Sequence, residues 1–154
     1  MGHAARVKSL PLSTVVQTSA AVAATRSRKD KTASLAAALA AATPEEAALV
    51  VSLLAGDPRQ GRIGIGWATL NRVASAHATQ SSLSIEDIDT ALDAIAAATG
   101  EGSARARSVI LGDLLARATE AEAEFLKRLL LGELRQGANE GLVVEGIAKA
   151  SGIK

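Results

Sequence analysis

The sequence predicts an all-α fold, a compact domain of about eight helices joined by glycine-rich turns. Alanine and leucine, which are strong helix formers, dominate the chain, and runs of β-branched residues are short. Signals that start and stop helices recur at spacings typical of helices. At 154 residues the chain fits one domain, which buries roughly two-thirds of the surface that its unfolded state exposes.

Two helices are expected in the first third of the chain. Pro11 suits the first position of a helix that runs to about Thr25, because its fixed φ matches the helical value. A basic stretch at residues 26–31 leads into a second helix, which carries Leu35 and Leu39.

The start of the third helix is the firmest boundary. Thr43 and Glu46 form a capping box, and Pro44 lies at the first helical position. Gly56 ends this helix. A loop follows, and then a fourth helix over about residues 66–76.

The next helices form a predicted hairpin. Ser84 caps the fifth helix and Gly100 ends it, and Ser103 caps the sixth. Thr119 caps the seventh helix, which stops at Gly132. An eighth helix, capped by an asparagine at position 139, completes the expected set.

The composition excludes several classes of protein. With zero cysteines the chain has no disulfide, no thiolate metal site and no cysteine nucleophile, which favours a reducing, cytoplasmic location. No run approaches the roughly 18 apolar residues of a membrane helix, and residues 10–24 are too polar for a secretory signal. We expect no membrane partner. Residues 1–11 are expected to be a leader, either native or added for expression.

Charge is distributed unevenly although the net charge is only +1. Residues 1–32 contain six Lys and Arg against the single acid Asp30, whereas residues 73–104 contain five acids and no Lys or Arg. Two explanations remain open: a basic face that steers a duplex and a separate acidic face, or an ordinary solvated surface.

Three glycine turns that carry arginine are the main chemical signal. They are Gly-Arg-Ile-Gly-Ile-Gly-Trp at 61–67, Gly-Glu-Gly-Ser-Ala-Arg-Ala-Arg at 100–107 and Leu-Arg-Gln-Gly-Ala-Asn at 134–139. Glycine lets backbone amides approach an anion, a following helix N-terminus adds partial positive charge, and arginine adds a forked donor. Helix capping alone explains any one turn, but three together indicate a grip on a phosphate backbone.

The predicted DNA contacts come from these turns and from the basic stretch at 26–31. Arg59 and Arg62 supply charge to the first turn, whereas Trp67 is expected to anchor the loop on the core. The full predicted set is Arg28, Arg62, Gly64, Gly66, Gly100, Gly102, Ser103, Arg105, Arg107, Arg135, Gly137 and Ala138.

The aromatic content limits the kind of nucleic acid that the chain can bind. One Trp, one Phe and no Tyr leave no platforms for base stacking, which argues against single-strand binders and RNA-binding sheets. The kind of binding that remains is to duplex DNA through its phosphates, with little base readout.

Catalysis finds little support in the sequence. The two histidines, His3 and His77, make no convincing triad or metal site, and the phosphate-binding motif of P-loop enzymes is absent. Four acids cluster in the first turns of the fifth helix, where carboxylates favour the helix dipole, and a metal or acid–base role for them is the minor alternative. They are Glu86, Asp87, Asp89 and Asp93. We therefore predict no catalytic, cofactor-binding or metal-binding residues.

Three segments together carry a family resemblance. They are Phe-Leu-Lys-Arg-Leu-Leu-Leu-Gly-Glu-Leu-Arg-Gln-Gly-Ala at 125–138, Gly-Glu-Gly-Ser at 100–103 and Ile-Gly-Ile-Gly-Trp at 63–67. Over residues 12–153 the chain resembles the N-terminal DNA-binding domain of ATP-dependent DNA ligases, most closely the actinobacterial enzymes of the archaeal and eukaryotic replicative type. The resemblance implies an all-helical domain that lies over the minor groove around a nick.

The resemblance also implies which turns meet phosphates, namely Gly100–Ser103 and Leu134–Gly137. Arg105 and Arg107 stand where the family has lysines, which keeps the charge, and Gln136 departs from the apolar residue common there. The implied role is positioning a ligase on nicked duplex DNA in replication and repair.

The resemblance places the catalytic chemistry outside this chain. No lysine is followed by x-Asp-Gly, the motif that the family adenylates, so the chain in isolation is expected not to be an enzyme. ATP and Mg²⁺ are expected for the full-length ligase only, and we expect the chain to end just before the adenylation domain. The implied partners are nicked duplex DNA and the adenylation and OB-fold domains of the parent ligase, with this chain a monomer.

Two other functions are weighed against DNA binding. In a helical protein-interaction or regulatory module the glycines would be helix caps only, and an apolar patch would be exposed. A base-excision glycosylase is suggested by the hairpin, but members of that group carry a Gly-Pro-Asp segment and this chain has no Gly-Pro dipeptide.

Overall fold

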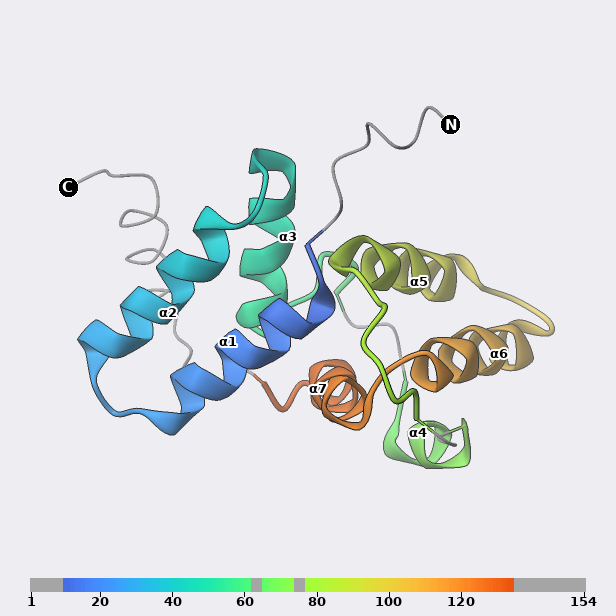
Figure 1. Ribbon diagram of the computed structural model, residues 1–154. Helices are drawn as coiled ribbons and strands as arrows, with labels where there is room; N and C mark the ends of the chain where they lie inside the picture. The colour runs from blue at the N-terminus through green and yellow to red at the C-terminus, as the bar shows by residue number, and fades with distance from the viewer. Residues whose placement is uncertain (1–9, 62–64, 74–76, 135–154) are drawn as a thin grey trace.

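Seven α-helices make up the described part of the chain, residues 10–61, 65–73 and 77–134 of a computed structural model (Figure 1). The helices are α1 (Leu12–Ala24), α2 (Arg28–Ala40), α3 (Pro44–Leu54), α4 (Trp67–Val73), α5 (Ile85–Ala97), α6 (Ser103–Ala116) and α7 (Glu120–Leu131). Within these residues the only β-type pairing is an isolated bridge between Pro11 and Ser84. The all-α prediction is confirmed, and the eighth predicted helix lies outside the described residues.

The helices form two groups. In Figure 1 α1, α2 and α3 lie on one side, α4, α5 and α6 lie on the other, and α7 lies between them. Within the groups α1 packs on α2, and α6 packs on both α4 and α5. Contacts between α3 and α5 join the α1–α3 group to the α4–α6 group, and α7 adds its contact with α1.

Leucine and isoleucine fill the core between the groups. The largest fully buried side chains come from six of the seven helices and from the segments that join them: Leu12, Leu53, Leu70, Leu83, Ile85, Ile88, Leu92, Ile95, Leu111, Leu115, Leu126 and Leu129. Each such side chain contributes about 1.5–3 kcal/mol when it leaves water, so this set supplies the main driving force for the fold. Among the described residues, no helix is both long enough and apolar enough to span a lipid bilayer.

The three predicted caps at Thr43, Ser84 and Thr119 are confirmed. Each side chain accepts a hydrogen bond from the amide three residues later, and the capping residue's own amide donates to the carboxylate at that position. Gly132 ends α7 in the left-handed conformation, as predicted, with φ of 77°.

Other predicted boundaries are wrong by a few residues. Pro11 precedes α1 rather than starting it, because its backbone is extended (ψ of 142°) and pairs with Ser84, just before α5. Ser103 is the first residue of α6 and not its cap; the cap position belongs to Gly102, with φ of 81°. Helix α5 ends at Ala97, before Gly100.

The segment Leu10–Leu12 ties three elements together. The Leu12 amide donates to the Leu83 carbonyl (2.9 Å), and the Ile85 amide donates to the Leu10 carbonyl (2.9 Å). The Leu10 amide donates to Oε2 of Glu46 in α3 (2.8 Å). The start of α1 is thereby fixed to both α3 and the start of α5.

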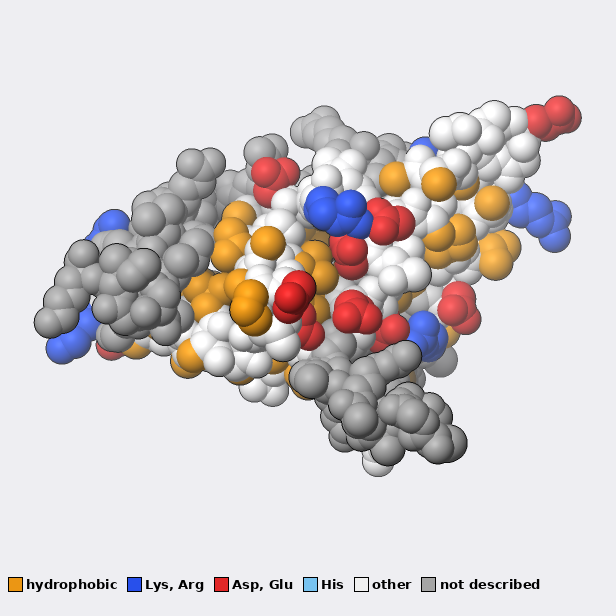
Figure 2. Space-filling model, turned by 90° about the horizontal axis from the view of Figure 1, so that it is seen from above, with side chains coloured by type: hydrophobic (Ala, Val, Ile, Leu, Met, Phe, Trp, Pro, Cys, Tyr) orange, Lys and Arg blue, Asp and Glu red, His pale blue; other side chains and the backbone are white. Residues whose placement is uncertain are grey.

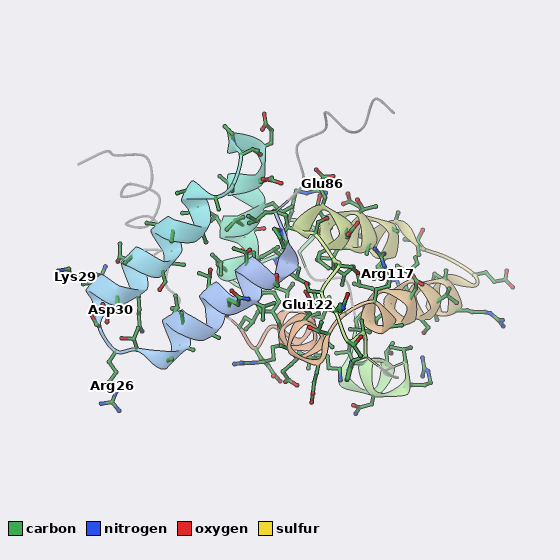
Figure 3. The ribbon with its side chains drawn as sticks, viewed as in Figure 1. Arg26, Lys29, Asp30, Glu86, Arg117 and Glu122 are labelled. Carbon is green, nitrogen blue, oxygen red and sulfur yellow. The ribbon has the colours of Figure 1, made fainter. Side chains whose placement is uncertain are left out.

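Glu122 is the most deeply buried charged side chain of the described residues, with 1% of its surface exposed. Its Oε1 accepts from the Thr119 amide (2.9 Å), and its Oε2 accepts from the Ser81 hydroxyl (2.6 Å). The carboxylate therefore holds the start of α7 and the segment before α5 at once (Figure 3).

Replacing Glu122 with alanine is expected to lower the free energy of unfolding by about 1–3 kcal/mol, since it leaves two donors without their acceptor. Urea denaturation followed by circular dichroism measures this. The matched control is Glu120→Ala, an exposed acid in the same first turn, with an expected cost of about 0.5 kcal/mol. Equal costs for the two variants would contradict the role of Glu122.

Candidate nucleic-acid interface

The turn between α5 and α6 depends on glycine for its backbone. Gly100 and Gly102 both have φ of 81°, in the left-handed region, and the Ser103 amide donates to the Gly100 carbonyl (3.1 Å). A Cβ added at either glycine would meet nothing within 4 Å. Glycine is required here by the backbone conformation and not by lack of space.

The N-terminus of α6 is open to an anion. The Gly102 carbonyl accepts from the Ala106 amide (3.1 Å), and no side chain caps the helix. The amides of Ala104 and Arg105 donate to no acceptor within the described residues. These amides and the dipole of a 14-residue helix favour a negative charge at this exposed end.

The two arginines of this turn differ in their surroundings. Arg105 is exposed, with no ion pair or hydrogen bond in the part of the chain that the structure describes. Arg107 is half-buried, and its Nε donates to the Ala98 carbonyl at the end of α5 (3.3 Å). Arg107 therefore stabilises the C-terminal end of α5, a role that the sequence did not predict. Its contact with DNA stays a prediction.

Arg72 joins this surface and was missed in the sequence. It lies in the last turn of α4, and its Nη2 donates to the Ser108 hydroxyl of α6 (3.3 Å). Ser108 follows Arg105 by three residues, so Arg72 and Arg105 lie along one face of α6. Helix spacing cannot reveal this, because the contact joins two helices.

Val109 lies on the same face, four residues after Arg105, with 63% of its surface exposed. Among the described residues, Val109 is the one large hydrophobic side chain that is exposed. We call Arg72, Arg105, Ser108, Val109 and the free amides at the start of α6 the α6 surface.

The other predicted contacts are less fully placed. Gly66 is exposed just before α4, and its carbonyl accepts from the Leu70 amide (3.1 Å). The remaining members of the first and third turns lie outside the described residues: Arg62, Gly64, Arg135, Gly137 and Ala138. Their contacts with DNA stay predictions.

Arg28 lies far from the α6 surface. It begins α2 at the corner with α1, where Figure 3 also places Arg26 and Lys29. This corner and the α5–α6 turn are at opposite ends of the molecule in Figure 1. The structure therefore brings Arg105 together with Arg72 and leaves Arg28 apart from both.

Acidic side chains occupy the space between these two basic ends. Figure 2 shows basic side chains at both ends of the molecule and most of the acidic ones between them. Asp87 accepts from the Ser84 amide (2.9 Å) and faces Arg117 (3.7 Å). No group of three or more His, Asp and Glu that could hold a metal ion occurs in the described ranges.

Arg59 is engaged by acids and does not stand beside the first glycine turn as a free cation. Its guanidinium pairs with Asp89 (2.9 Å) and Asp93 (2.7 Å) of α5. Hydrogen bonds to Asp89 and then to Asp93 raise the pKa of Arg59. The pKa of Asp93 is lowered by its hydrogen bond from Gln60, and also by Arg59.

Comparison with known proteins identifies the family. The family model for the DNA ligase N terminus matches residues 69–148, which is more than half of the chain. The chain belongs to this family, and the resemblance found in the sequence is confirmed.

Three similar curated proteins are each named probable DNA ligase. That of Saccharopolyspora erythraea is 51% identical over 143 residues, covering 93% of this chain and 28% of the relative. That of Anaeromyxobacter sp. is 48% identical over 146 residues (94% and 28%), and that of Nocardia farcinica is 50% identical over 139 residues (90% and 27%). The chain thus spans little more than a quarter of the length of these relatives.

Alanine at Gly100 or Gly102 is expected to lower the free energy of unfolding by about 1–2 kcal/mol, because a side chain strains a left-handed residue. Gly66→Ala is the matched control: that glycine is also exposed with open space around it, but its φ is not positive. We expect a change of about 0.5 kcal/mol or less there. Urea denaturation compares the variants, and equal costs at all three positions would contradict the requirement for glycine.

In acid, the fold is expected to lose the stabilisation that the ionised Asp93 carboxylate provides. Because the folded state lowers the pKa of Asp93, the ionised carboxylate stabilises the fold above its ordinary pKa of 3.8. That stabilisation disappears as the pH falls through the lowered folded pKa. Asp93→Asn should therefore melt below the unaltered chain at pH 7, by a small margin because the pair is exposed, and the margin should close in strong acid.

Thermal melts from neutral to strongly acidic pH measure the margin. Asp113→Asn, at an exposed carboxylate without an ion pair in the described residues, serves as the control. A margin for Asp93→Asn that stays constant with pH contradicts the expectation.

Proposed function

We propose that this chain is the duplex-binding module of an ATP-dependent DNA ligase and positions that enzyme on nicked DNA. Membership of the DNA ligase N-terminus family supports the role in a ligase. The observation that carries the DNA-binding step is the α6 surface, where unpaired helix amides lie beside an exposed arginine.

Phosphate binding follows from the chemistry of this surface. The amides of Ala104 and Arg105 can donate to one phosphate oxygen, in the place where the helix dipole favours negative charge. The guanidinium of Arg105 adds forked donors, and Arg72 adds a second cation along the same helix face. We propose that these donors contact neighbouring phosphates on one strand.

The proposed mode of binding is independent of base sequence. Backbone amides and arginines that meet phosphates carry no sequence information, and the chain has few aromatic side chains for stacking on bases. Val109 suits contact with the sugars that line the minor groove, since it is apolar, exposed and on the same helix face as Arg105. The α1–α2 corner, with Arg28, would meet a different stretch of the backbone from the other end of the molecule.

The proposed division of labour leaves the chemistry to other parts of the ligase. ATP and Mg²⁺ would act in the adenylation domain, and we propose that this domain and the OB-fold domain are the covalent partners of the module. The module itself holds the duplex, without catalytic residues of its own, as a monomer in the cytoplasm. Nick sealing in replication and repair is the proposed setting.

Arg105→Gln is expected to weaken binding to a nicked duplex about tenfold, the loss of one charge-assisted contact. Since each phosphate contact releases counterions, the slope of log K against log salt should also fall by about 0.9. Fluorescence anisotropy with a labelled nicked duplex at several salt concentrations measures both quantities.

Arg117→Gln is the matched control, because it removes an exposed arginine at the far end of the same helix. Its affinity and slope should stay those of the unaltered chain. Unchanged binding by Arg105→Gln would reject the assignment of Arg105. A complete lack of salt-dependent binding by the unaltered chain would reject the proposed function in favour of a helical protein-interaction module.

A further inference from the structure

A cluster of four polar side chains joins the loop after α3 to α5. Arg59 Nε donates to Oδ1 of Asp89 (3.2 Å), and Nη2 donates to Oδ2 of Asp89 (2.9 Å) and to both carboxylate oxygens of Asp93 (2.7 Å). Asp89 and Asp93 lie one helical turn apart, so one guanidinium spans both carboxylates. We call Arg59, Gln60, Asp89 and Asp93 the Arg59 cluster.

Gln60 binds the same two acids. Its Nε2 donates to the Asp89 carbonyl (3.2 Å), to Oδ1 of Asp89 (2.8 Å) and to Oδ1 of Asp93 (2.9 Å). Its Oε1 is buried without a hydrogen-bond partner, which is unfavourable by itself. The amide group is thus held in the one orientation that directs its N–H groups at the carboxylates.

The loop that carries Arg59 is attached to α3. The Gly56 amide donates to the Leu53 carbonyl (3.1 Å), and the Asp57 amide donates to the Ser52 carbonyl (2.9 Å). A tight turn follows, in which the Gly61 amide donates to the Pro58 carbonyl (2.8 Å). Arg59 and Gln60 are therefore held close to the C-terminal end of α3. The Arg59 cluster thus links the α1–α3 group to the α4–α6 group.

Hydrogen bonds between the loop after α3 and α5 restrict relative motions of the two helices that apolar packing alone would permit. Helices α3 and α5 are in contact, and leucine, isoleucine and valine side chains of both belong to one buried apolar cluster, in which attraction does not depend on direction. Hydrogen bonds weaken steeply when their angles change. Seven such bonds to neighbouring turns of α5 resist rotation of one group against the other.

We propose that the Arg59 cluster is a positioning element that sets the orientation of the α6 surface relative to the α1–α2 corner. This inference rests on the proposed function, in which both ends of the molecule contact one duplex. The cluster itself is a poor phosphate site, because two carboxylates repel phosphate and occupy the guanidinium of Arg59. Arg59 acts through α3 and α5 and not by touching DNA.

The test is the double variant Asp89→Asn/Asp93→Asn, compared with Glu45→Gln/Glu124→Gln, which removes the same two charges from exposed positions away from both the cluster and α6. Removing negative charge alone strengthens DNA binding, and the control measures that effect. Relative to the control, the cluster variant should bind nicked duplex at least about fivefold more weakly, a typical size for coupling between sites. The salt slope should match the control, since no phosphate contact is lost.

Two other results would contradict the positioning role. If the acids merely keep Arg59 from the DNA, the cluster variant will bind more tightly than the control, with a salt slope steeper by about 0.9. That result, or an affinity equal to the control, overturns the positioning role.

A measurement without DNA separates this inference from the proposed function. The chain has no cysteine, so Ala23→Cys in α1 and Ala116→Cys in α6, both exposed, allow two spin labels to be attached specifically. Pulsed electron paramagnetic resonance should give one narrow distance distribution, and Asp89→Asn/Asp93→Asn should broaden or shift it. An unchanged distribution rejects the positioning role even where DNA binds, whereas failure of the unaltered chain to bind DNA rejects the proposed function.

Discussion

The fold depends on the hydrogen bonds that fix residues 10–12 between α3 and α5. Backbone bonds join Leu10 and Leu12 to residues 83–85, and Glu46 holds the Leu10 amide from the side of α3. The α1–α3 group and the α4–α6 group meet through apolar side chains, so these bonds and the Arg59 cluster fix their relative arrangement. Without a fixed arrangement, charged groups at the two ends of the molecule could not serve one ligand.

The sequence was most informative where a structural signal is local. The caps at Thr43, Ser84 and Thr119 act over three residues, and all three form. The turn at Gly100 and Gly102 was also visible, but the choice of Ser103 as cap was wrong because the left-handed Gly102 takes that position. The sequence offers both a serine, which can cap with its side chain, and a glycine, which easily adopts the left-handed conformation. The glycine backbone conformation determines where α6 begins.

Contacts between distant elements escaped prediction for a physical reason. Arg59 and its acids are about thirty residues apart in the sequence, and Arg72 meets Ser108 across two helices. Nothing in helical periodicity reports such pairings, since they depend on how helices pack. Arg59 therefore looked like a free cation, and Arg72 was overlooked, although both lie in segments whose secondary structure was broadly anticipated.

The bond from Arg107 to the Ala98 carbonyl has a kinetic consequence for the turn beside it. Together with the two left-handed glycines it holds the loop between α5 and α6 in shape before any anion arrives. Little conformational entropy is then lost on binding, and little rearrangement is needed on release. In the proposed function, such a rigid cradle would let the chain exchange one phosphate for the next along a duplex with little rearrangement.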